Sequence, residues 1–372
     1  MSLTPITLLT GFLGSGKTTL LNHLLRDPAA GRVAVVINEF GDIGLDHDLV
    51  QEATEEMVLM QSGCLCCTIR GDLARTLIDL VARRQAGEIG FDRVVIETTG
   101  LADPGPILHT LLLDQGLAAA FRLDGVVVTA DAAVGPRTLD LQGEAVNQIA
   151  MADRIVISKA DLVTADALAA FEARLAVINP GAGRLRADHG RVDVADLFDI
   201  SGLDGDAGVG QVLEWINAAA YEGARAPLAR GPEPARPLGA MDYGLFGAGR
   251  APAPLPGLKH PGHHDRRITS VSITIDHPIP ADVFEHWLET LINLRGRDIL
   301  RMKGIIYVEG RAAPFALHGV QHIFHPMTEL ARFPAGETVS RIVVIARDIP
   351  QAQLEASLEV LKLRPGVRSW QA

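Results

Sequence analysis

The stretch Gly11-Phe12-Leu13-Gly14-Ser15-Gly16-Lys17-Thr18 decides the fold of this chain. It follows the apolar run Ile6–Thr10 and opens the helical pattern Lys17–Arg26, which is the strand–loop–helix context that a phosphate-binding loop requires. In such a loop the backbone N–H groups close around phosphate oxygens, the lysine supplies positive charge, and the threonine hydroxyl binds Mg²⁺. The residues expected to hold a nucleotide here are Gly11, Gly14, Ser15, Gly16, Lys17, Thr18 and Thr19.

Outward from this loop, the first part of the chain alternates short β-branched runs with longer helical patterns. This alternation is typical of a mostly parallel sheet covered by helices. Further strands are expected at Arg32–Asn38, Met57–Met60, Arg93–Glu97, Gly125–Ala130 and Arg154–Ser158. Further helices are expected at Asp72–Arg84, Ala165–Ile178 and Val209–Ala219. We therefore predict an α/β nucleotide-binding domain over residues 1–222.

A smaller unit is expected after a segment rich in Gly, Pro, Ala and Arg. Residues 223–267 have the composition of a linker, because such a segment cannot hold a helix and buries little surface. Beyond it, strands are expected at Ile268–Asp276, Lys303–Val308, Val320–Phe324 and Arg341–Arg347, and helices at Pro280–Leu294 and Gln351–Leu363. These elements predict an α+β domain over residues 268–372.

The composition argues against several classes of protein. The chain has 372 residues, 48% of them hydrophobic, and a net charge of −11. A general nucleic-acid binder needs a basic surface, so no nucleic-acid partner is expected. The N-terminus lacks the pattern of a signal peptide, and no apolar run approaches the ~20 residues of a membrane helix. We expect a cytoplasmic protein without a membrane partner.

The tetrapeptide Ser158-Lys159-Ala160-Asp161 follows an expected strand and has the position of a guanine-reading element. The carboxylate of Asp161 can accept two hydrogen bonds from guanine, whereas adenine offers no such pair of donors. The stem of Lys159 can lie along the base, and Ser158 stands where Asn is commoner. Asn179 and Pro180, which follow an expected helix, are further candidates for the base pocket.

A second polar segment, Glu97-Thr98-Thr99-Gly100, follows the apolar strand ending at Ile96. Here Glu97 can orient a Mg²⁺-bound or attacking water, and Gly100 can let the backbone approach the γ-phosphate. The alternative is a helix-capping turn without a catalytic role. The residues expected to act in catalysis are Lys17, Glu97 and Gly100.

All three cysteines of the chain lie within four positions, at Cys64, Cys66 and Cys67. Thiolates bind Zn²⁺, Co²⁺ and Cu⁺, and no second cysteine pair is available to close a structural zinc site. The cluster therefore predicts an open metal site that suits transfer of the ion. A redox pair, a vicinal disulfide and inert thiols are the alternatives. Three side chains between the phosphate loop and the cysteines can complete the shell, with the first preferred: Glu39, Asp42 and His47.

Three histidines in the second domain, His318, His322 and His325, form another possible metal site. They lie on an expected strand and its edges, so they need not converge on one ion. We favour a role without a metal for them.

Taken together, these motifs resemble those of the CobW-type metallochaperone GTPases, which belong to the SIMIBI class of P-loop proteins. The matching stretches are Thr10–Asn22, Asn38–Gly41, Gly63–Cys67, Glu97–Pro104, Ser158–Asp161 and, in the second domain, Gly319–His322 and Arg341–Val344. The resemblance implies a P-loop GTPase fold followed by a CobW C-terminal α+β domain. It also implies GTP binding with slow hydrolysis, a divalent metal at the Cys-x-Cys-Cys motif, and delivery of that metal to a client protein.

Carried over by position, the resemblance assigns phosphate and Mg²⁺ binding to Lys17 and Thr18, guanine reading to Asp161, and metal binding to the three cysteines. Two departures from the family pattern are Ser158 in place of Asn and Asp42 in place of Glu. The long His-rich linker of some members is also missing, which argues against metal storage.

The leading hypothesis is a GTP-dependent metal chaperone for zinc, with cobalt as the second choice. Its cofactors are GTP, Mg²⁺ and Zn²⁺, with Co²⁺ as the alternative ion, and its partner is a client metalloprotein. A homodimer is one possible assembly. The hypothesis from another class is a non-catalytic metal or redox sensor that binds a nucleotide. A small-molecule kinase is disfavoured by the guanine element.

Overall fold

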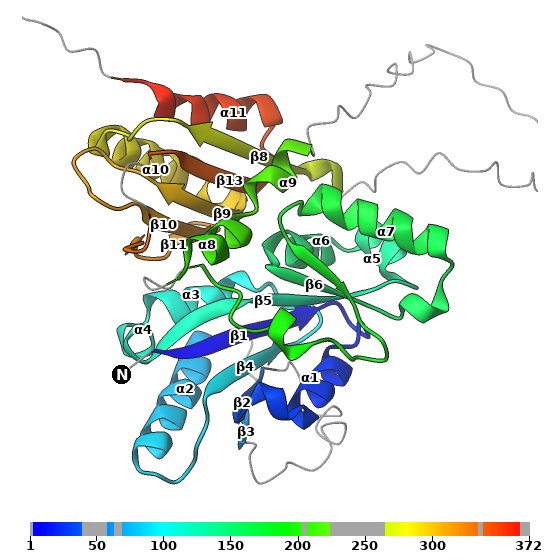
Figure 1. Cartoon of the computed structure of the whole chain (residues 1–372). Coiled ribbons are helices and arrows are strands. Elements are labelled where there is room, and N and C mark those ends of the chain that lie inside the picture. Colours follow the sequence, from blue (N-terminus) through cyan, green and yellow to red (C-terminus); the bar gives the residue numbers. More distant parts are fainter. Residues whose placement is uncertain are drawn as a thin grey trace, which may run out of the picture.

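The computed structural model describes residues 3–38, 58–62, 69–202, 207–223, 265–333 and 338–364. These residues form an α/β domain and a smaller α+β domain that pack against each other (Figure 1). Within these ranges no helix is long and apolar enough to cross a membrane.

The first domain is built on a seven-stranded sheet of order β3-β2-β4-β1-β5-β6-β7, in which every pairing is parallel. Its strands are β1 (Thr4–Gly11), β2 (Val33–Asn38), β3 (Val58–Ser62), β4 (Arg93–Thr98), β5 (Phe121–Asp131), β6 (Arg154–Ser158) and β7 (Gly183–Arg186). The central strands are continuously apolar because both faces of the sheet are covered. Leu8 and Val128 belong to the core on one face, and Leu9 and Val127 to the core on the other.

The helices of this domain are α1 (Lys17–Arg26), α2 (Ile69–Gln85), α3 (Gly105–Leu113), α4 (Gln115–Ala120), α5 (Gly135–Leu141), α6 (Gly143–Met151), α7 (Ala165–Ile178), α8 (Val209–Ile216) and α9 (Ala218–Gly223). Helix α1 covers one face through Leu20, Leu21 and Leu24. Helices α2, α3 and α6 contribute to the core on the opposite face. The phosphate loop therefore joins a central strand to a helix at the carboxyl edge of the sheet.

The second domain holds an antiparallel sheet of order β11-β10-β9-β13-β8, with β12 paired to β10. Its elements are β8 (Ile268–Ile275), α10 (Ala281–Arg295), β9 (Ile299–Ile306), β10 (Phe315–Val320), β11 (Ile323–Phe324), β12 (Thr328–Glu329), β13 (Ser340–Arg347) and α11 (Gln351–Glu359). One face packs on α10 and α11 through residues such as Val271, Ile342 and Val344. On the other face, Val343 and Ile345 join the core of the first domain, so the two domains share buried surface.

A buried ion cluster lies at this junction. Asp153, just before β6, accepts from Arg301 Nη2 at 2.5 Å and from Lys303 Nζ at 2.7 Å, and both cations come from β9. Burial opposes the ionisation of Asp153, but the two cations hold its pKa well below the usual range. Burial lowers the pKa of Lys303 to about 8. The cluster therefore ties the domains together by mutually paired charges.

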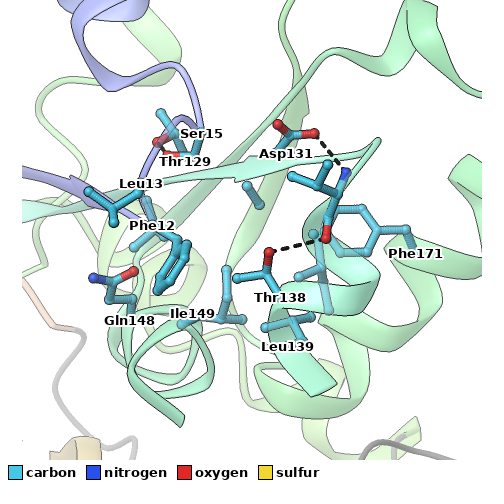
Figure 2. A pocket seen from close by; sticks show the side chains of 16 residues that line it. Phe12, Leu13, Ser15, Thr129, Asp131, Thr138, Leu139, Gln148, Ile149 and Phe171 are labelled. Atoms are coloured by element: carbon cyan, nitrogen blue, oxygen red, sulfur yellow. Dashed lines mark hydrogen bonds between the residues drawn. The ribbon is translucent and has the colours of Figure 1, made fainter. Parts of the chain in front are cut away.

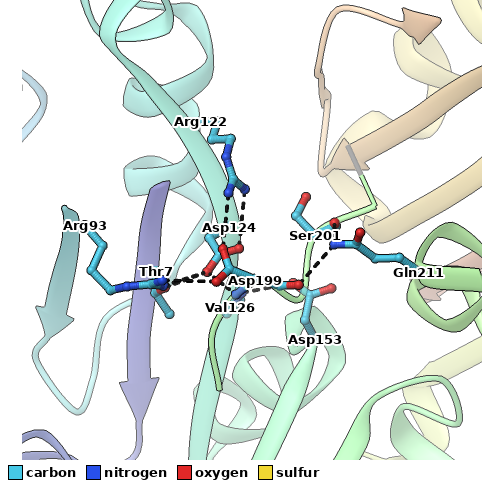
Figure 3. Close-up of polar contacts among 9 residues, drawn as sticks. All are labelled: Thr7, Arg93, Arg122, Asp124, Val126, Asp153, Asp199, Ser201 and Gln211. Atoms are coloured by element: carbon cyan, nitrogen blue, oxygen red, sulfur yellow. Dashed lines mark hydrogen bonds and ion pairs between the residues drawn. The ribbon is translucent and has the colours of Figure 1, made fainter. Parts of the chain in front are cut away.

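A second polar network lies at the amino edge of the first sheet (Figure 3). The fully buried Asp124 accepts from Thr7 Oγ1 at 3.2 Å and from the Asp199 backbone N–H at 2.9 Å. The guanidinium groups of Arg93 and Arg122 lie 3.6 and 3.5 Å from its oxygens. Burial raises the pKa of Asp124 despite these partners. This network closes the edge of the sheet that faces away from the phosphate loop.

The fold class predicted from the sequence is confirmed: an α/β domain with a parallel sheet precedes a smaller α+β domain. Helices Lys17–Arg26 and Ala165–Ile178 and strand Arg154–Ser158 have the predicted bounds. The expected helix Val209–Ala219 is instead interrupted at Asn217, which has a φ of 46° and donates to Gly181 O. Residues 224–264, most of the predicted linker, lie outside the described ranges, and the domain boundaries stay predictions.

The expected strand Val320–Phe324 is wrong in its centre. The chain turns between β10 and β11, and Gln321 takes a left-handed φ of 55° at that turn. This turn faces the first domain, a placement that strand periodicity alone does not reveal.

Candidate nucleotide-binding site

The phosphate loop is held in a shape that requires glycine. Gly11 has a φ of 142°, and a Cβ added there would lie 2.3 Å from Thr129 Oγ1. Gly16 precedes α1 with a φ of 96°, in the left-handed region that glycine tolerates. The loop therefore brings the N-terminus of α1 to the carboxyl edge of the sheet, where its free N–H groups suit an anion.

Two side chains of the loop point inward. Lys17 is 9% exposed, and its Nζ donates to the carbonyl oxygens of Gly11 at 3.0 Å and Phe12 at 3.3 Å. The hydroxyl of Ser15 lies 2.6 Å from Thr129 Oγ1 on β5. Ser15 thus contributes its side chain to loop packing, which leaves its backbone as the part suited to a phosphate.

The predicted Mg²⁺ ligand Thr18 meets the predicted catalytic Glu97 directly. Thr18 Oγ1 donates to Glu97 Oε1 at 3.0 Å, and Glu97 is a buried residue near the end of β4. A hydroxyl and a carboxylate at a helix start form an oxygen donor set that fits Mg²⁺. The structure therefore joins two residues that are 79 positions apart in the chain.

The segment after β4 lies close against the phosphate loop. A Cβ added to Gly100 would lie 2.5 Å from the backbone N of Leu13, so only glycine fits at this approach. The buried hydroxyl of Thr99 has no hydrogen-bond partner among the described residues. An unpaired buried hydroxyl is unusual in a folded protein, and Thr99 directly precedes Gly100, which approaches the phosphate loop.

The guanine-reading element is bonded to the same loop. Ser158 Oγ donates to Ser15 O at 2.7 Å, and Lys159 Nζ donates to Gly14 O at 2.9 Å. Asp161 lies on the short 3₁₀ turn Ala160–Leu162 and is exposed. Ser158 and Lys159 therefore brace the loop, and the exposed carboxylate of Asp161 is placed to meet a ligand.

The sequence analysis missed two residues next to this element. Asp131, the last residue of β5, lies 2.6 Å from Lys159 Nζ and also accepts from Ala133 N at 2.7 Å. His189 follows β7, and its pKa is raised by a hydrogen bond to Asp188 and by the nearby charge of Asp161. A carboxylate ending an apolar strand was the available signal for Asp131.

Thr19 is exposed on the first turn of α1, and Gly190 of the loop after β7 lies beside it. A Cβ on Gly190 would lie 2.9 Å from Thr19 Cγ2. The loop that carries His189 thus borders the start of α1.

Asn179 does not line a base pocket, which corrects the sequence-based expectation. Its side chain is buried, and Nδ2 donates to the carbonyls of Ile149, Ala150 and Ala152 at 2.9, 3.1 and 2.9 Å. It caps the C-terminal end of α6, where the last carbonyls lack the N–H partner four residues on that a continuing helix would supply.

A small cavity lies behind the phosphate loop, between β5 and helices α5 to α7 (Figure 2). Phe12, Ile149 and Phe171 are among its lining residues, and its volume is about 30 Å³. This space matches one water molecule, so it is a packing gap and too small for a nucleotide.

The predicted zinc ligands Cys64, Cys66, Cys67 and Glu39 lie outside the described residues, as do Asp42 and His47. The strands that lead to them are described. Asn38 at the end of β2 pairs with Ser62 at the end of β3 and with Thr98 at the end of β4. The chain therefore leaves the sheet toward Glu39 and toward Cys64 at neighbouring positions of one edge.

The three histidines of the second domain do not converge. His318 is buried on β10 with its ring 5.9 Å from that of Trp215, and burial holds its pKa well below the usual value. His322 instead faces His109, and His325 Nδ1 contacts Pro326 O. No group of three or more His, Cys, Asp or Glu side chains in the described ranges is arranged to hold a metal ion.

Two family descriptions match this chain. The CobW/HypB/UreG nucleotide-binding domain matches residues 5–186, and the cobalamin synthesis protein cobW C-terminal domain matches residues 268–362. The zinc chaperone YjiA of Escherichia coli is 29% identical over 359 residues, covering 96% of this chain and 98% of that protein. The zinc-regulated GTPase metalloprotein activator 1 of Schizosaccharomyces pombe is 38% identical over 207 residues, covering 54% of this chain and 49% of its own length.

Among solved structures, the zinc-bound YjiA GTPase of E. coli superposes with a TM-score of 0.68 at 25% identity. The match covers 98% of this chain and 100% of that one. Both domains therefore have the architecture of that protein.

Proposed function

The chain belongs to the CobW/HypB/UreG family of nucleotide-binding proteins, and from that premise we propose that it is a GTP-dependent zinc metallochaperone. It hydrolyses GTP slowly to GDP and phosphate, and it delivers the ion to a client metalloprotein. The relatives above are named for zinc, so the cobalt alternative is not favoured.

The observation that carries this proposal is the shared edge of the first sheet. The Thr18–Glu97 hydrogen bond of 3.0 Å lies where β1 and β4 end, and Asn38, Ser62 and Thr98 end their strands in register beside it. The strands leading to the predicted zinc ligands thus end next to the nucleotide site. A structural change caused by the γ-phosphate can therefore reach the predicted metal-binding segment through adjacent strand ends.

In the hydrolysis step, Lys17 exchanges its carbonyl contacts for phosphate oxygens. Thr18 and Glu97 would hold Mg²⁺, and the ion would supply positive charge that offsets the negative charge of the phosphates. Glu97 also orients the attacking water, and Gly100 brings its backbone to the γ-phosphate. The unpaired Thr99 hydroxyl supports this assignment, because a phosphate or water beside it would satisfy that buried group.

Guanine is read by Asp161, with Lys159 along the base and Ser158 supporting the phosphate loop. The contacts of Lys159 with Gly14 O and Asp131 support this role, since they fix the turn that carries Asp161.

Zinc is held as cargo by Cys64, Cys66 and Cys67, with Glu39 as the fourth ligand. GTP gathers these groups, and hydrolysis releases the ion to the client. A homodimer and a cytoplasmic location stay predictions of the sequence, as does the lack of nucleic-acid and membrane partners.

Zinc titration with a non-hydrolysable GTP analogue and with GDP tests this function. We expect tighter zinc binding in the analogue-bound state and loss of that binding in Cys66→Ala. Equal zinc affinity in the two nucleotide states would contradict the coupling. Absence of GTP turnover with zinc and any client would instead favour the non-catalytic sensor.

A further inference from the structure

One buried amide of α6 holds the loop that follows β4. Gln148 on α6 is 1% exposed, and its Nε2 donates to Gly100 O at 3.2 Å and to Ala102 O at 3.0 Å. Both donor hydrogens of the amide are thereby bound to one loop, residues 100–103. Removing this donor would leave two carbonyls without their partner in a mostly buried setting, which is costly.

The loop held by Gln148 is the one that touches the phosphate loop. Gly100 approaches Leu13 so closely that a Cβ would lie 2.5 Å from the Leu13 backbone N. Gln148 lines the same small cavity as Phe12 and Leu13 (Figure 2). A ligand that moves the phosphate loop would therefore also change the hydrogen bonds that Gln148 makes with residues 100 and 102.

The other side of α6 is bonded to the second domain. Asn147, next to Gln148, accepts from Arg347 Nη1 at 3.3 Å, and Met151 O at the helix end accepts from the buried Arg301. The same Arg301 binds Asp153. Helix α6, which has nine residues, thus contacts both loop 100–103 and the sheet of the second domain.

The far end of the loop reaches the second domain directly. Asp103 Oδ2 accepts from Gln321 Nε2 at 3.2 Å, and a Cβ on Gly105 would lie 2.9 Å from the Gln321 side chain. The adjacent His322 ring lies 6.0 Å from that of His109 on α3. Loop 100–103 is therefore hydrogen-bonded to α6 at one end and to the β10–β11 turn at the other.

We propose that Gln148 is a positioning residue for GTP hydrolysis, and that α6 and the Gln321 turn report the position of loop 100–103 to the second domain. The inference rests on the proposed GTPase function for its kinetic part only. A γ-phosphate that draws Gly100 toward it changes the loop's contacts with Gln148 and Asp103, and so biases how the second domain sits on the first.

Gln148→Leu removes the donor while keeping the size of the side chain. We expect kcat for GTP to fall on the order of 10- to 100-fold, with KM changed by less than about threefold, because the loop is misplaced and not the nucleotide. Gln142→Leu, the same change at the residue just before α6, serves as the matched control and keeps the wild-type kcat. A kcat within about twofold of wild type in folded Gln148→Leu would overturn the positioning role.

Hydrogen exchange tests the coupling of loop 100–103 to the second domain, and it does not require GTP turnover. Wild type loaded with a non-hydrolysable GTP analogue and with GDP should differ in amide exchange at residues 321–324, and the difference should vanish in Gln148→Leu. Gln321→Ala, a change at the surface turn, should reduce it by at least about twofold. No difference in wild type, or a difference that persists in both variants, overturns the inference. A wild type without GTP turnover would count against the proposed function alone.

Discussion

Two lysines in the described part of the chain are almost fully buried, and they have contrasting partners. Lys303 at the domain junction lies 2.7 Å from the carboxylate of Asp153, a residue of the other domain. Lys17 in the phosphate loop donates to the backbone carbonyls of Gly11 and Phe12. A carboxylate offsets a buried charge, whereas a carbonyl is a neutral acceptor.

This difference in partners distinguishes Lys303, which stabilises the domain junction, from Lys17, whose surroundings suit a ligand. A phosphate competes readily with a carbonyl for an ammonium group, but it competes poorly with a buried carboxylate. At the junction the charges are matched within the protein, and at the phosphate loop the arrangement suits an incoming anion. Four substitutions test this contrast.

Asp153→Ala should have the largest effect on folding. It leaves Arg301 and Lys303 buried without their shared carboxylate, which costs about 3–5 kcal/mol of unfolding free energy. Urea denaturation measures this loss. Asp79→Ala, at an exposed acid on α2, is the matched control and should change stability by less than about 0.5 kcal/mol. Similar losses in the two variants would contradict a structural role for the junction cluster.

Lys17→Ala should lower kcat/KM for GTP by about 100- to 1,000-fold, the usual result of removing one group that stabilises developing charge. Two of its hydrogen bonds go to loop carbonyls, so we expect a smaller fall in melting temperature than for Asp153→Ala. Steady-state GTP hydrolysis and thermal unfolding, measured on one preparation, test whether activity is lost without a large loss of stability. A variant that unfolds as readily as Asp153→Ala would erase the contrast between the two lysines.

Asp161→Asn should change base choice more than stability. The asparagine offers one acceptor and one donor, which suits the N1–H and the 2-oxo group of xanthine better than the two donors of guanine. We expect GTP to bind about 10- to 100-fold more weakly and xanthosine triphosphate to gain, as measured by competition binding. Asp166→Asn, an exposed neighbour on α7, should leave both affinities unchanged. Unaltered base preference in Asp161→Asn would remove it from the base site.

Arg32→Ala should have the smallest effect. Its pair with Asp92 at 2.9 Å is about half exposed on both sides, so we expect a loss of at most about 1 kcal/mol at pH 7. The hydrogen bond from Arg32 lowers the pKa of Asp92 from 3.8. This contribution is therefore present above pH 3.8 and is lost as the pH falls through the lower folded value. Urea denaturation should show a larger difference between the variant and wild type at pH 7 than at pH 2.5.

The first sheet was predictable because its strands are apolar and its phosphate loop is distinctive. Helices α3 and α6 were missed, since α3 is apolar at most positions and shows no polar face from which a helical period can be read. The predicted site residues Lys17, Thr18 and Glu97 do meet at one edge, because parallel strands bring their carboxyl ends together.

Gln148 could not be predicted from local sequence. The carbonyl partners of Gln148 lie 48 and 46 positions away, and nothing near it in sequence reveals those contacts. Asn179 shows the opposite error. A polar residue after a helix suggested a ligand contact, but its amide donates to three backbone carbonyls. Polar residues whose partners are distant backbone groups are assigned only by the folded chain.

The position of β3 at the edge of the described sheet has a further consequence. It is paired to β2 alone, whereas β2, β4 and β1 are each held on both sides. Separating β3 breaks one ladder of backbone hydrogen bonds, so its amides should exchange with solvent sooner than those of β1. The strand that leads toward the cysteines, like β7 at the opposite edge, should thus detach more easily than the nucleotide-binding strands, which suits the proposed exchange of a cargo ion.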